Sequence, residues 1–330
     1  MSQRKRVLVT GGAGFIGSHV AEQFVAQGFE VAVVDNLSTG RREYVPGAAQ
    51  FFPYDIKSQE TFALICRWRP QVICHHAAQM SVRFSVADPL EDARENILGS
   101  LNIFQAAAIA GVKKIIFAST GGAIYGDEAP LPAREADPAF PDCPYGIAKL
   151  AVEHYLRFYQ RQYGLVPITL RYANVYGPRQ NGLGEAGVVA IFIEKFLAGE
   201  QPVINGDGLQ TRDFVYVGDV VRANLLALDY PKAGVFNIGT GLETDILTIF
   251  LKLQDLAGSK LGPVHGPAKP GEQRRSVLDS RQAQDLLDWQ PEITLTEGLT
   301  QTVASFRGEG AGAHRPLAPS PMTSTLKRNG

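Results

Sequence analysis

The sequence is poor in cysteine. Its 330 residues include three cysteines, Cys66, Cys74 and Cys143, which are widely spaced and form no CxxC pair. An odd number of scattered cysteines argues against a disulfide framework and against a structural zinc site, so we predict no bound metal. Scarce, unpaired cysteines are typical of a reducing compartment, and we predict a cytoplasmic location.

Long apolar runs and an excess of charge of one sign are also missing. The first apolar stretch, residues 7–10 behind three basic residues, is far shorter than the core of a signal sequence or a membrane-spanning helix. The 32 lysines and arginines nearly balance the 33 aspartates and glutamates. A chain with so little net charge has no overall field that attracts nucleic acid or an anionic membrane, and we predict neither as a partner.

What the sequence does contain is the composition of a globular enzyme, with 45% hydrophobic residues, 20% charged residues and 34 glycines. Its length suits one large domain or two closely joined ones. Short β-branched segments at 7–10, 30–34 and 115–119 alternate with helical patterns such as 18–27 and 146–163. This alternation predicts an α/β fold built on a doubly wound parallel (Rossmann) sheet.

The alternation ends near residue 176, where glycines become frequent and the predicted elements become shorter. We therefore predict a Rossmann domain over 1–175, with a later return near 215–240, and a smaller α/β substrate-binding domain over 176–306. From residue 307 onward, Gly, Pro, Ser and Thr replace the periodic apolar residues. That change predicts a disordered tail over 307–330.

Three glycines, Gly11, Gly14 and Gly17, lie between the first predicted strand and the first predicted helix. The first permits a tight turn, the second lets the backbone approach a pyrophosphate, and the third lets the helix and the strand pack closely. The N-terminus of the helix then faces the anion. In this context the glycines predict a dinucleotide-binding turn.

Asp35 ends the second predicted strand. Its carboxylate would accept hydrogen bonds from the adenosine ribose and repel a 2′-phosphate, so we predict NAD rather than NADP as the cofactor. One of Arg41 and Arg42 could reach a 2′-phosphate, although solvated loop charges explain both more simply. Asp55 and Ile56, at the end of the third predicted strand, could hold the adenine edge; a capping aspartate beside a core isoleucine is the simpler alternative.

Tyr145 and Lys149 are four residues apart at the start of a helical pattern, so their side chains share one face. Such a pair is common by chance, but it gains meaning in a dinucleotide fold with Ser119 and Thr120 at the end of a central strand. A phenol with a reference pKa of about 10 is a poor base at neutral pH. A nearby ammonium and a positive nicotinamide ring both favour the phenolate. We therefore interpret the pair as a candidate proton-transfer site.

These residues belong to a series of motifs that runs from about Arg6 to Leu299. The motifs are TGGAGFIG (10–17), DNL (35–37), DI (55–56), HAA (76–78), YGIAK (145–149), LRYANVYGP (170–178), GDG (206–208), RDFVYV (212–217), FNIG (236–239) and PGE (270–272). In this order they resemble the extended short-chain dehydrogenase/reductase family, and within it the NAD-dependent nucleotide-sugar epimerases of the UDP-glucose 4-epimerase type. The resemblance alone does not fix the reaction, because epimerases, dehydratases, decarboxylases and reductases share this fold.

The resemblance implies an isomerase that acts on a UDP-hexose bound in the smaller domain. Tyr145 would take the proton from the sugar C4 hydroxyl while C4 passes its hydride to NAD, and the resulting 4-keto sugar would rotate and regain the hydride on its other face. Lys149 would bind the nicotinamide ribose and lower the pKa of Tyr145. The family also implies a homodimer; the helical patterns at 92–110 and 147–163 have apolar faces that could pair across a two-fold axis, and core burial explains them equally well.

The resemblance also assigns contacts residue by residue. The cofactor contacts that it implies are Gly11, Gly14, Phe15, Ile16, Gly17, Asp35, Asn36, Asp55, Ile56, Ala77, Ala78, Tyr145, Lys149 and Tyr172. The substrate contacts that it implies are Thr120, Tyr145, Asn174, Arg212, Lys269 and Ser276. From its sequence position alone, Arg212 beside Asp213 would more simply be a surface pair.

The segment after the predicted strand at 115–119 departs from the family pattern. Counting back from Tyr125, the serine or threonine with which the family binds the sugar C4 hydroxyl falls on Gly121. Either Thr120 or Ser119 takes that role or a water molecule replaces the hydroxyl, and we assign the role to Thr120. The acidic residues that related dehydratases and decarboxylases use stand here as Gly122 and Ala123. Elimination and decarboxylation would lack their acid, and 4-epimerisation is favoured.

Two alternatives remain beside a UDP-glucose/UDP-galactose 4-epimerase. A UDP-glucuronate 4-epimerase would need a cationic partner for the extra carboxylate, for which Arg83 is a candidate. A non-catalytic dinucleotide-sensing module would have no use for Tyr145 and Lys149. Ser276 is small, and in related epimerases a small residue at that position leaves room for a 2-acetamido group, so we expect the N-acetylated UDP-hexoses to be accepted as well. The alternative is that Ser276 is a polar residue in an exposed turn after Arg274 and Arg275.

Overall fold

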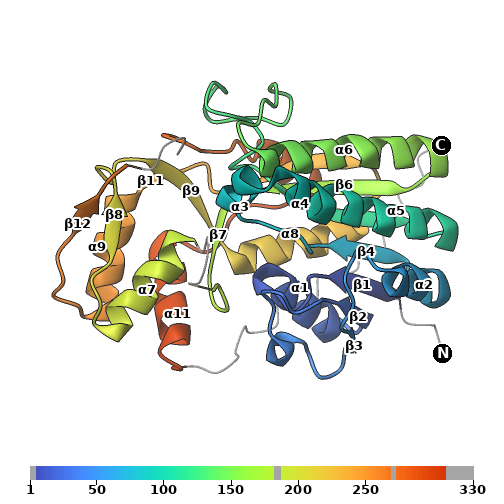
Figure 1. Ribbon diagram of the computed structural model, residues 1–330, viewed down its shortest axis with the longest axis horizontal. Helices are drawn as coiled ribbons and strands as arrows, with labels where there is room; N and C mark the ends of the chain where they lie inside the picture. Colours follow the sequence, from blue (N-terminus) through green and yellow to red (C-terminus); the bar gives the residue numbers. More distant parts are fainter. Residues whose placement is uncertain (1–4, 182–186, 269–272, 310–330) are drawn as a thin grey trace, which may run out of the picture.

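A seven-stranded sheet organises the larger half of the molecule (Figure 1). The computed structural model describes residues 5–181, 187–268 and 273–309. In spatial order the strands are β10 (Gly234–Ile238), β6 (Val166–Tyr172), β5 (Lys114–Thr120), β4 (Val72–His75), β1 (Arg6–Thr10), β2 (Glu30–Val34) and β3 (Gln50–Phe52). All neighbouring strands are parallel. The predicted doubly wound parallel sheet is confirmed, and the strand order changes direction between β1 and β4, where such sheets bind ligands.

Both faces of the sheet are covered by helices because successive strand residues point to opposite sides. In β1, Val7 and Val9 pack into one hydrophobic core and Leu8 into the other. The helices of the first core are α1 (Phe15–Ala26), α8 (Val217–Asp229) and α10 (Arg281–Leu287), and those of the second are α2 (Gln59–Trp68), α5 (Gly99–Ala110) and α6 (Pro144–Tyr163). This layering leaves the carboxyl ends of the strands open toward the smaller half.

The helix that the sequence predicts to end at Ala110 is interrupted. Short helices α3 (Val82–Ala87) and α4 (Pro89–Ala93) lead into a π-helical turn, η2 (Arg94–Leu98), before α5 begins. In that turn, Asn96 Nδ2 donates to Asp92 Oδ1 and to Gln79 O, both at 2.9 Å. The turn therefore ties this helix to the segment that follows β4.

In the part of the chain that the structure describes, the smaller half is built from short strands and helices, and it lies to the left in Figure 1. Its strands are β7 (Asn174–Tyr176), β9 (Thr211–Tyr216) and β11 (Glu243–Asp245) in one sheet, and β8 (Val203–Asn205) with β12 (Val264–Gly266) in another. The helices α7 (Val188–Ala198), α9 (Ile246–Ala257) and α11 (Leu295–Phe306) enclose a third core, in which Phe192, Phe196 and Phe250 pack edge to face.

The chain returns to the larger half through α8 and β10, which pack on and extend the seven-stranded sheet. The predicted tail lies outside the described residues from 310 onward. Within the described ranges, no helix combines the length and the hydropathy that a membrane crossing requires.

Candidate active site

The glycine turn between β1 and α1 is too crowded for side chains. Gly11 has a φ of +68°, and a Cβ atom on it would lie 2.6 Å from Ala77 N. A Cβ atom on Gly17 would lie 2.2 Å from Gly11 O. The backbone of the turn is therefore bare where it meets the cavity, as a bound pyrophosphate requires, and the N-terminus of α1 opens toward the same place.

Asp35 joins the end of β2 to the glycine turn. Its Oδ2 accepts a hydrogen bond from Ala13 N at 2.9 Å, and its Oδ1 accepts one from Leu37 N at 2.8 Å. The side chain is 8% exposed and lines the cavity. Its carboxylate is thus fixed by two backbone amides and keeps lone pairs for further donors.

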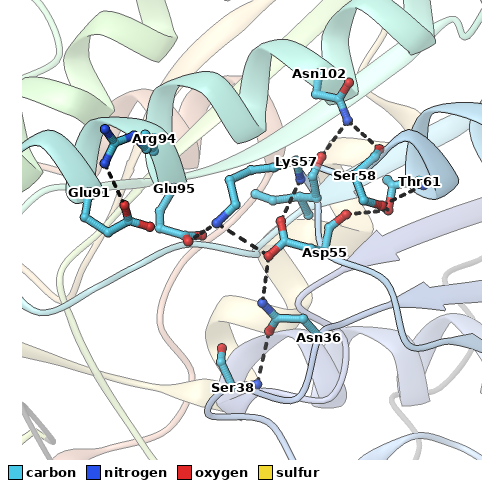
Figure 2. A network of polar contacts seen from close by, with 11 residues as sticks. Asn36, Ser38, Asp55, Lys57, Ser58, Thr61, Glu91, Arg94, Glu95 and Asn102 are labelled. Carbon is cyan, nitrogen blue, oxygen red and sulfur yellow. Dashed lines mark hydrogen bonds and ion pairs between the residues drawn. The ribbon is translucent and has the colours of Figure 1, made fainter.

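Asp55 does not line the cavity itself and belongs to the polar network of Figure 2. Its Oδ1 accepts from Lys57 N at 2.7 Å, and its Oδ2 accepts from Asn36 Nδ2 at 3.1 Å. Burial would lower the pKa of Lys57, but the ion pairs with Glu95 and Asp55 raise it. Asn36 and Ile56 line the cavity, whereas Asp55 does not, so Asp55 orients Asn36. Strand β3 also ends at Phe52, three residues before Asp55 rather than beside it.

One cavity of about 1730 Å³ gathers the residues predicted to bind the cofactor. The predicted residues that line it are Gly11, Gly14, Phe15, Ile16, Gly17, Asp35, Asn36, Ile56, Ala77, Ala78, Tyr145, Lys149 and Tyr172. They come from the segments that follow β1, β2, β3 and β4, from the end of β6 and from the first turns of α1 and α6. The strand order that the sheet adopts therefore joins the glycine turn and the tyrosine–lysine pair in a single site.

Tyr145 and Lys149 occupy the first turns of α6 and share one face of it. Lys149 Nζ donates to Ala118 O at 2.9 Å and lies 5.8 Å from the centre of the Tyr145 ring. Burial lowers the pKa of Lys149 to about 8, while the charges of Asp92 and Glu153 act to raise it. Burial raises the pKa of Tyr145, which is the opposite of what the lysine alone would cause. A phenol whose pKa is raised by burial needs a second positive charge nearby, besides the lysine, to act as a base.

The same face of α6 continues into a buried polar network that the sequence analysis missed. Glu153 accepts a hydrogen bond from Ser119 Oγ at 2.6 Å and forms an ion pair with Arg171 at 2.6 Å. Arg171 Nη1 donates to the hydroxyl of Tyr125 at 2.9 Å, which donates to Asn237 Oδ1 at 2.7 Å. A charged Arg171 within an otherwise uncharged strand was the signal that could have revealed it.

His76 is a second cavity residue without an assigned role. Its ring stacks on Tyr172 with centroids 6.3 Å apart, and its Nε2 lies 3.3 Å from the Tyr172 hydroxyl. Asn224 Nδ2 donates to that hydroxyl at 2.8 Å. Burial lowers the pKa of His76 to about 3, so the ring is neutral. The stack forms an uncharged wall of the cavity near Lys149.

The predicted substrate residue Thr120 lies at the end of β5, and its Oγ1 accepts from Ala123 N at 3.2 Å. It is not among the residues that line the cavity, whereas Ala118 and Ser119 are. A Cβ atom on Gly121 would lie 2.4 Å from Cδ1 of the buried Leu278. A serine at residue 121 would therefore require the side chain of Leu278 to shift.

Three further predicted substrate residues, Asn174, Arg212 and Ser276, are also not among the residues that line the cavity. Asn174 begins β7, and its Oδ1 lies 3.6 Å from a Cβ atom built on Gly122. Arg212 donates to Thr211 O at 2.8 Å, and the buried Asp213 accepts from Thr240 Oγ1 at 2.6 Å. The alternative of an Arg212–Asp213 surface pair is thus wrong, because Asp213 is buried and accepts hydrogen bonds from Thr240 and Gly241.

Ser276 is 5% exposed and follows Arg275, which bridges to Thr211 beside Arg212. The fold thus places Ser276 and Arg212 on adjacent segments. Lys269 lies outside the described residues. Among the described residues, no cluster of histidine, cysteine and acidic side chains could hold a metal ion.

Residues 7–239 match the family model described as the NAD dependent epimerase/dehydratase family. The chain belongs to this family. It is 42% identical over 310 residues to a UDP-glucose 4-epimerase of Mycolicibacterium smegmatis, a match that covers 92% of this chain and 99% of that protein. The resemblance predicted from the motifs is confirmed.

Solved structures of the family match the fold closely. A UDP-glucose 4-epimerase of Thermotoga maritima with UDP-glucose superposes with a TM-score of 0.90 at 49% identity, covering 92% of this chain and 99% of that one. A UDP-glucose 4-epimerase of Thermus thermophilus in complex with NAD gives a TM-score of 0.87 at 46% identity, with coverage of 92% and 99%.

Proposed function

We propose that this protein is an NAD-dependent UDP-hexose 4-epimerase that interconverts UDP-glucose and UDP-galactose. One observation carries the proposal: the glycine turn and the Tyr145–Lys149 pair line one cavity, in a chain that closely matches enzymes of this activity. The bare glycine cradle and the fixed Asp35 carboxylate fit a dinucleotide. When bound, NAD supplies a reversible hydride acceptor beside the sugar.

The residues of this chain then divide the remaining tasks. Tyr145 accepts the proton of the sugar C4 hydroxyl and returns it, and Lys149 holds the nicotinamide ribose. Thr120 supports the C4 oxygen: its Oγ1 already accepts from Ala123 N, which leaves the hydroxyl hydrogen to donate. Asn174 and Arg212 hold the nucleotide diphosphate, for which a guanidinium gives charge-assisted hydrogen bonds.

The absence of acids beside Thr120 supports epimerisation over elimination or decarboxylation, since Gly122 and Ala123 offer no carboxyl group. Arg83, the candidate partner for the carboxylate of a UDP-uronic acid, is an exposed residue of the short helix α3. A sensing module would not need the tyrosine–lysine pair. A neutral UDP-hexose is therefore the favoured substrate.

The proposal is tested by incubating the NAD-loaded protein with UDP-galactose and separating the products by chromatography. UDP-glucose should appear and approach a constant ratio to UDP-galactose from either direction, with no net change in NADH. A protein that carries NAD and converts neither sugar would refute the proposal.

Replacing Asp35 with alanine is expected to weaken NAD binding and to relax discrimination against NADP. The substitution removes an acceptor for the ribose hydroxyls and a charge that repels a 2′-phosphate. It also frees the amides of Ala13 and Leu37. The measurement is the ratio of dissociation constants for NAD and NADP, and an unchanged ratio would show that Asp35 does not face the ribose.

Replacing Ser276 with tyrosine is expected to abolish turnover of UDP-N-acetylhexosamines while sparing UDP-hexoses. We propose that Ser276 borders the sugar, where its small side chain leaves room for an acetamido group that a phenol ring would exclude. The measurement is kcat/KM for both substrate classes in both proteins. If their ratio is the same in the variant as in the wild type, Ser276 does not border the sugar.

We also propose that the protein forms a homodimer through α5 and α6. A surface depression of about 620 Å³ between these helices is lined partly by Leu98, Tyr155 and Phe158, which are 56%, 41% and 51% exposed. Two such faces meeting across a two-fold axis would bury these side chains as a four-helix contact. A second copy fits this surface because it presents the same apolar face.

Replacing Phe158 with glutamate is expected to yield a monomer, because a two-fold contact places the new charge against the apolar face of the partner. Light scattering after gel filtration measures the mass. Arg134→Ala, in the exposed loop before α6, is the control and should keep the mass of the wild type. A Phe158→Glu protein of wild-type mass would place any dimer contact elsewhere.

A further inference from the structure

The turn that follows β7 carries an arginine in a backbone conformation that favours glycine. Gln180 N donates to Gly177 O at 3.3 Å, which closes a four-residue turn with Pro178 and Arg179 in the middle. Arg179 has a φ of +66°. A turn with proline second and a positive φ third is of type II, in which glycine or asparagine normally stands third. An arginine there costs conformational free energy, which points to a use for its side chain.

That side chain reaches across to the larger half of the molecule. Arg179 Nη1 donates to Ser18 Oγ at 3.2 Å, and Nη2 donates to Glu22 Oε2 at 2.7 Å. The guanidinium carbon lies 5.5 Å from the centre of the Tyr44 ring. In Figure 1 the segment after β7 descends to α1, the helix to which Ser18 and Glu22 belong. These contacts fix the guanidinium above the first turns of that helix.

Arg179 also lines the cavity that the glycine turn opens, together with its neighbours Pro178 and Gln180. Its side chain is 21% exposed. A guanidinium has five N–H donors, of which Ser18 and Glu22 take two. The rest are available to an anion at the N-terminus of α1, where a dinucleotide places its diphosphate.

We propose that Arg179 retains the dinucleotide by presenting its guanidinium to the diphosphate from a turn of the smaller half. The inference rests on the proposed function, because an epimerase regenerates its cofactor in every cycle and gains from holding it. Charge-assisted hydrogen bonds from a fixed guanidinium oppose release of the diphosphate. The arginine thus closes the cavity over the cofactor, and the strained turn is the cost of placing it there.

The test uses the purified holoenzyme and the variant Arg179→Gly. Glycine suits a positive φ, so the variant should keep its melting temperature within a few degrees, since the ion pair that it loses is partly exposed. Its NAD release rate should rise about 10–100-fold, the effect of losing a hydrogen bond to a charged group. Release is followed as NAD that remains bound after dilution into NAD-free buffer. A merely structural role would lower the melting temperature instead.

Arg179→Asn provides a second variant, because asparagine also tolerates a positive φ and lacks the guanidinium. Arg134→Ala is the matched control: it removes a guanidinium from an ion pair with Asp137, 3.1 Å long, outside the cavity. NAD release within twofold of wild type in a folded Arg179→Gly or Arg179→Asn protein would overturn the inference. Failure of the wild type to epimerise would refute the proposed function and leave this comparison of release rates intact.

Discussion

Replacing Tyr145 with phenylalanine is expected to lower kcat on the order of 10²–10⁴-fold, the loss typical for removal of a general base. The variant removes one hydroxyl and keeps the ring, so the start of α6 and the cavity wall keep their shape. Bound NAD should be retained, because Lys149 keeps its hydrogen bond to Ala118 O. The measurement combines steady-state turnover of UDP-galactose with the NAD content of the purified variant.

The control for this prediction is Tyr159→Phe, about four turns further along α6 and outside the cavity lining. Its hydroxyl lies 3.1 Å from Gln105 Oε1, so the substitution removes a comparable hydrogen bond without touching the site. It should turn over at nearly the wild-type rate. A Tyr145→Phe protein that keeps more than about a tenth of wild-type turnover would exclude Tyr145 as the base.

Local patterns predicted much of this architecture. The glycine turn, the acid at the end of β2 and the tyrosine–lysine pair are each specified within a few residues, because turn geometry and helical spacing are local. The parallel sheet followed from the alternation of strands and helices. The π-helical turn at Arg94–Leu98 has no such pattern; the Asn96 side chain within it donates hydrogen bonds to Asp92 and Gln79. The sequence therefore predicted one continuous helix where the structure has three segments.

Contacts between residues that are far apart in the chain could not be predicted from the sequence. Asp55 was expected at the end of a strand, but β3 ends three residues earlier, and the Asp55 carboxylate accepts hydrogen bonds from Lys57 N and Asn36 Nδ2 rather than lining the cavity. Arg179 stood beside the recognised motif, but its ion pair with Glu22 joins residues far apart in the chain. A single sequence gives the spacing of residues along the chain but not their distance in the folded protein. Contacts such as the Arg179–Glu22 ion pair can therefore be identified only when the order of the strands in the sheet is known.

The buried ion pair between Glu153 and Arg171 leads to the largest expected effect on stability. The two side chains are 8% and 6% exposed, and Arg171 also donates to Tyr125. Burial would lower the pKa of Arg171, but its contacts with Glu153 and Tyr125 raise it. Replacing Arg171 with methionine leaves the carboxylate of Glu153 buried without its cation, which typically costs about 3–5 kcal/mol.

Urea denaturation of the Arg171→Met variant should therefore show a free energy of unfolding lower by that amount. The double variant Glu153→Met/Arg171→Met should recover most of the loss, because an apolar pair of similar volume removes the stranded charge. Lys195→Ala breaks an exposed pair with Glu200, whose side chains are 39% and 65% exposed, and should cost less than about 1 kcal/mol. If Arg171→Met costs no more than this control, the pair does not stabilise the fold. The double variant should still turn over UDP-galactose more slowly than the wild type, because Ser119 on the cavity wall loses the carboxylate that accepts its hydrogen bond.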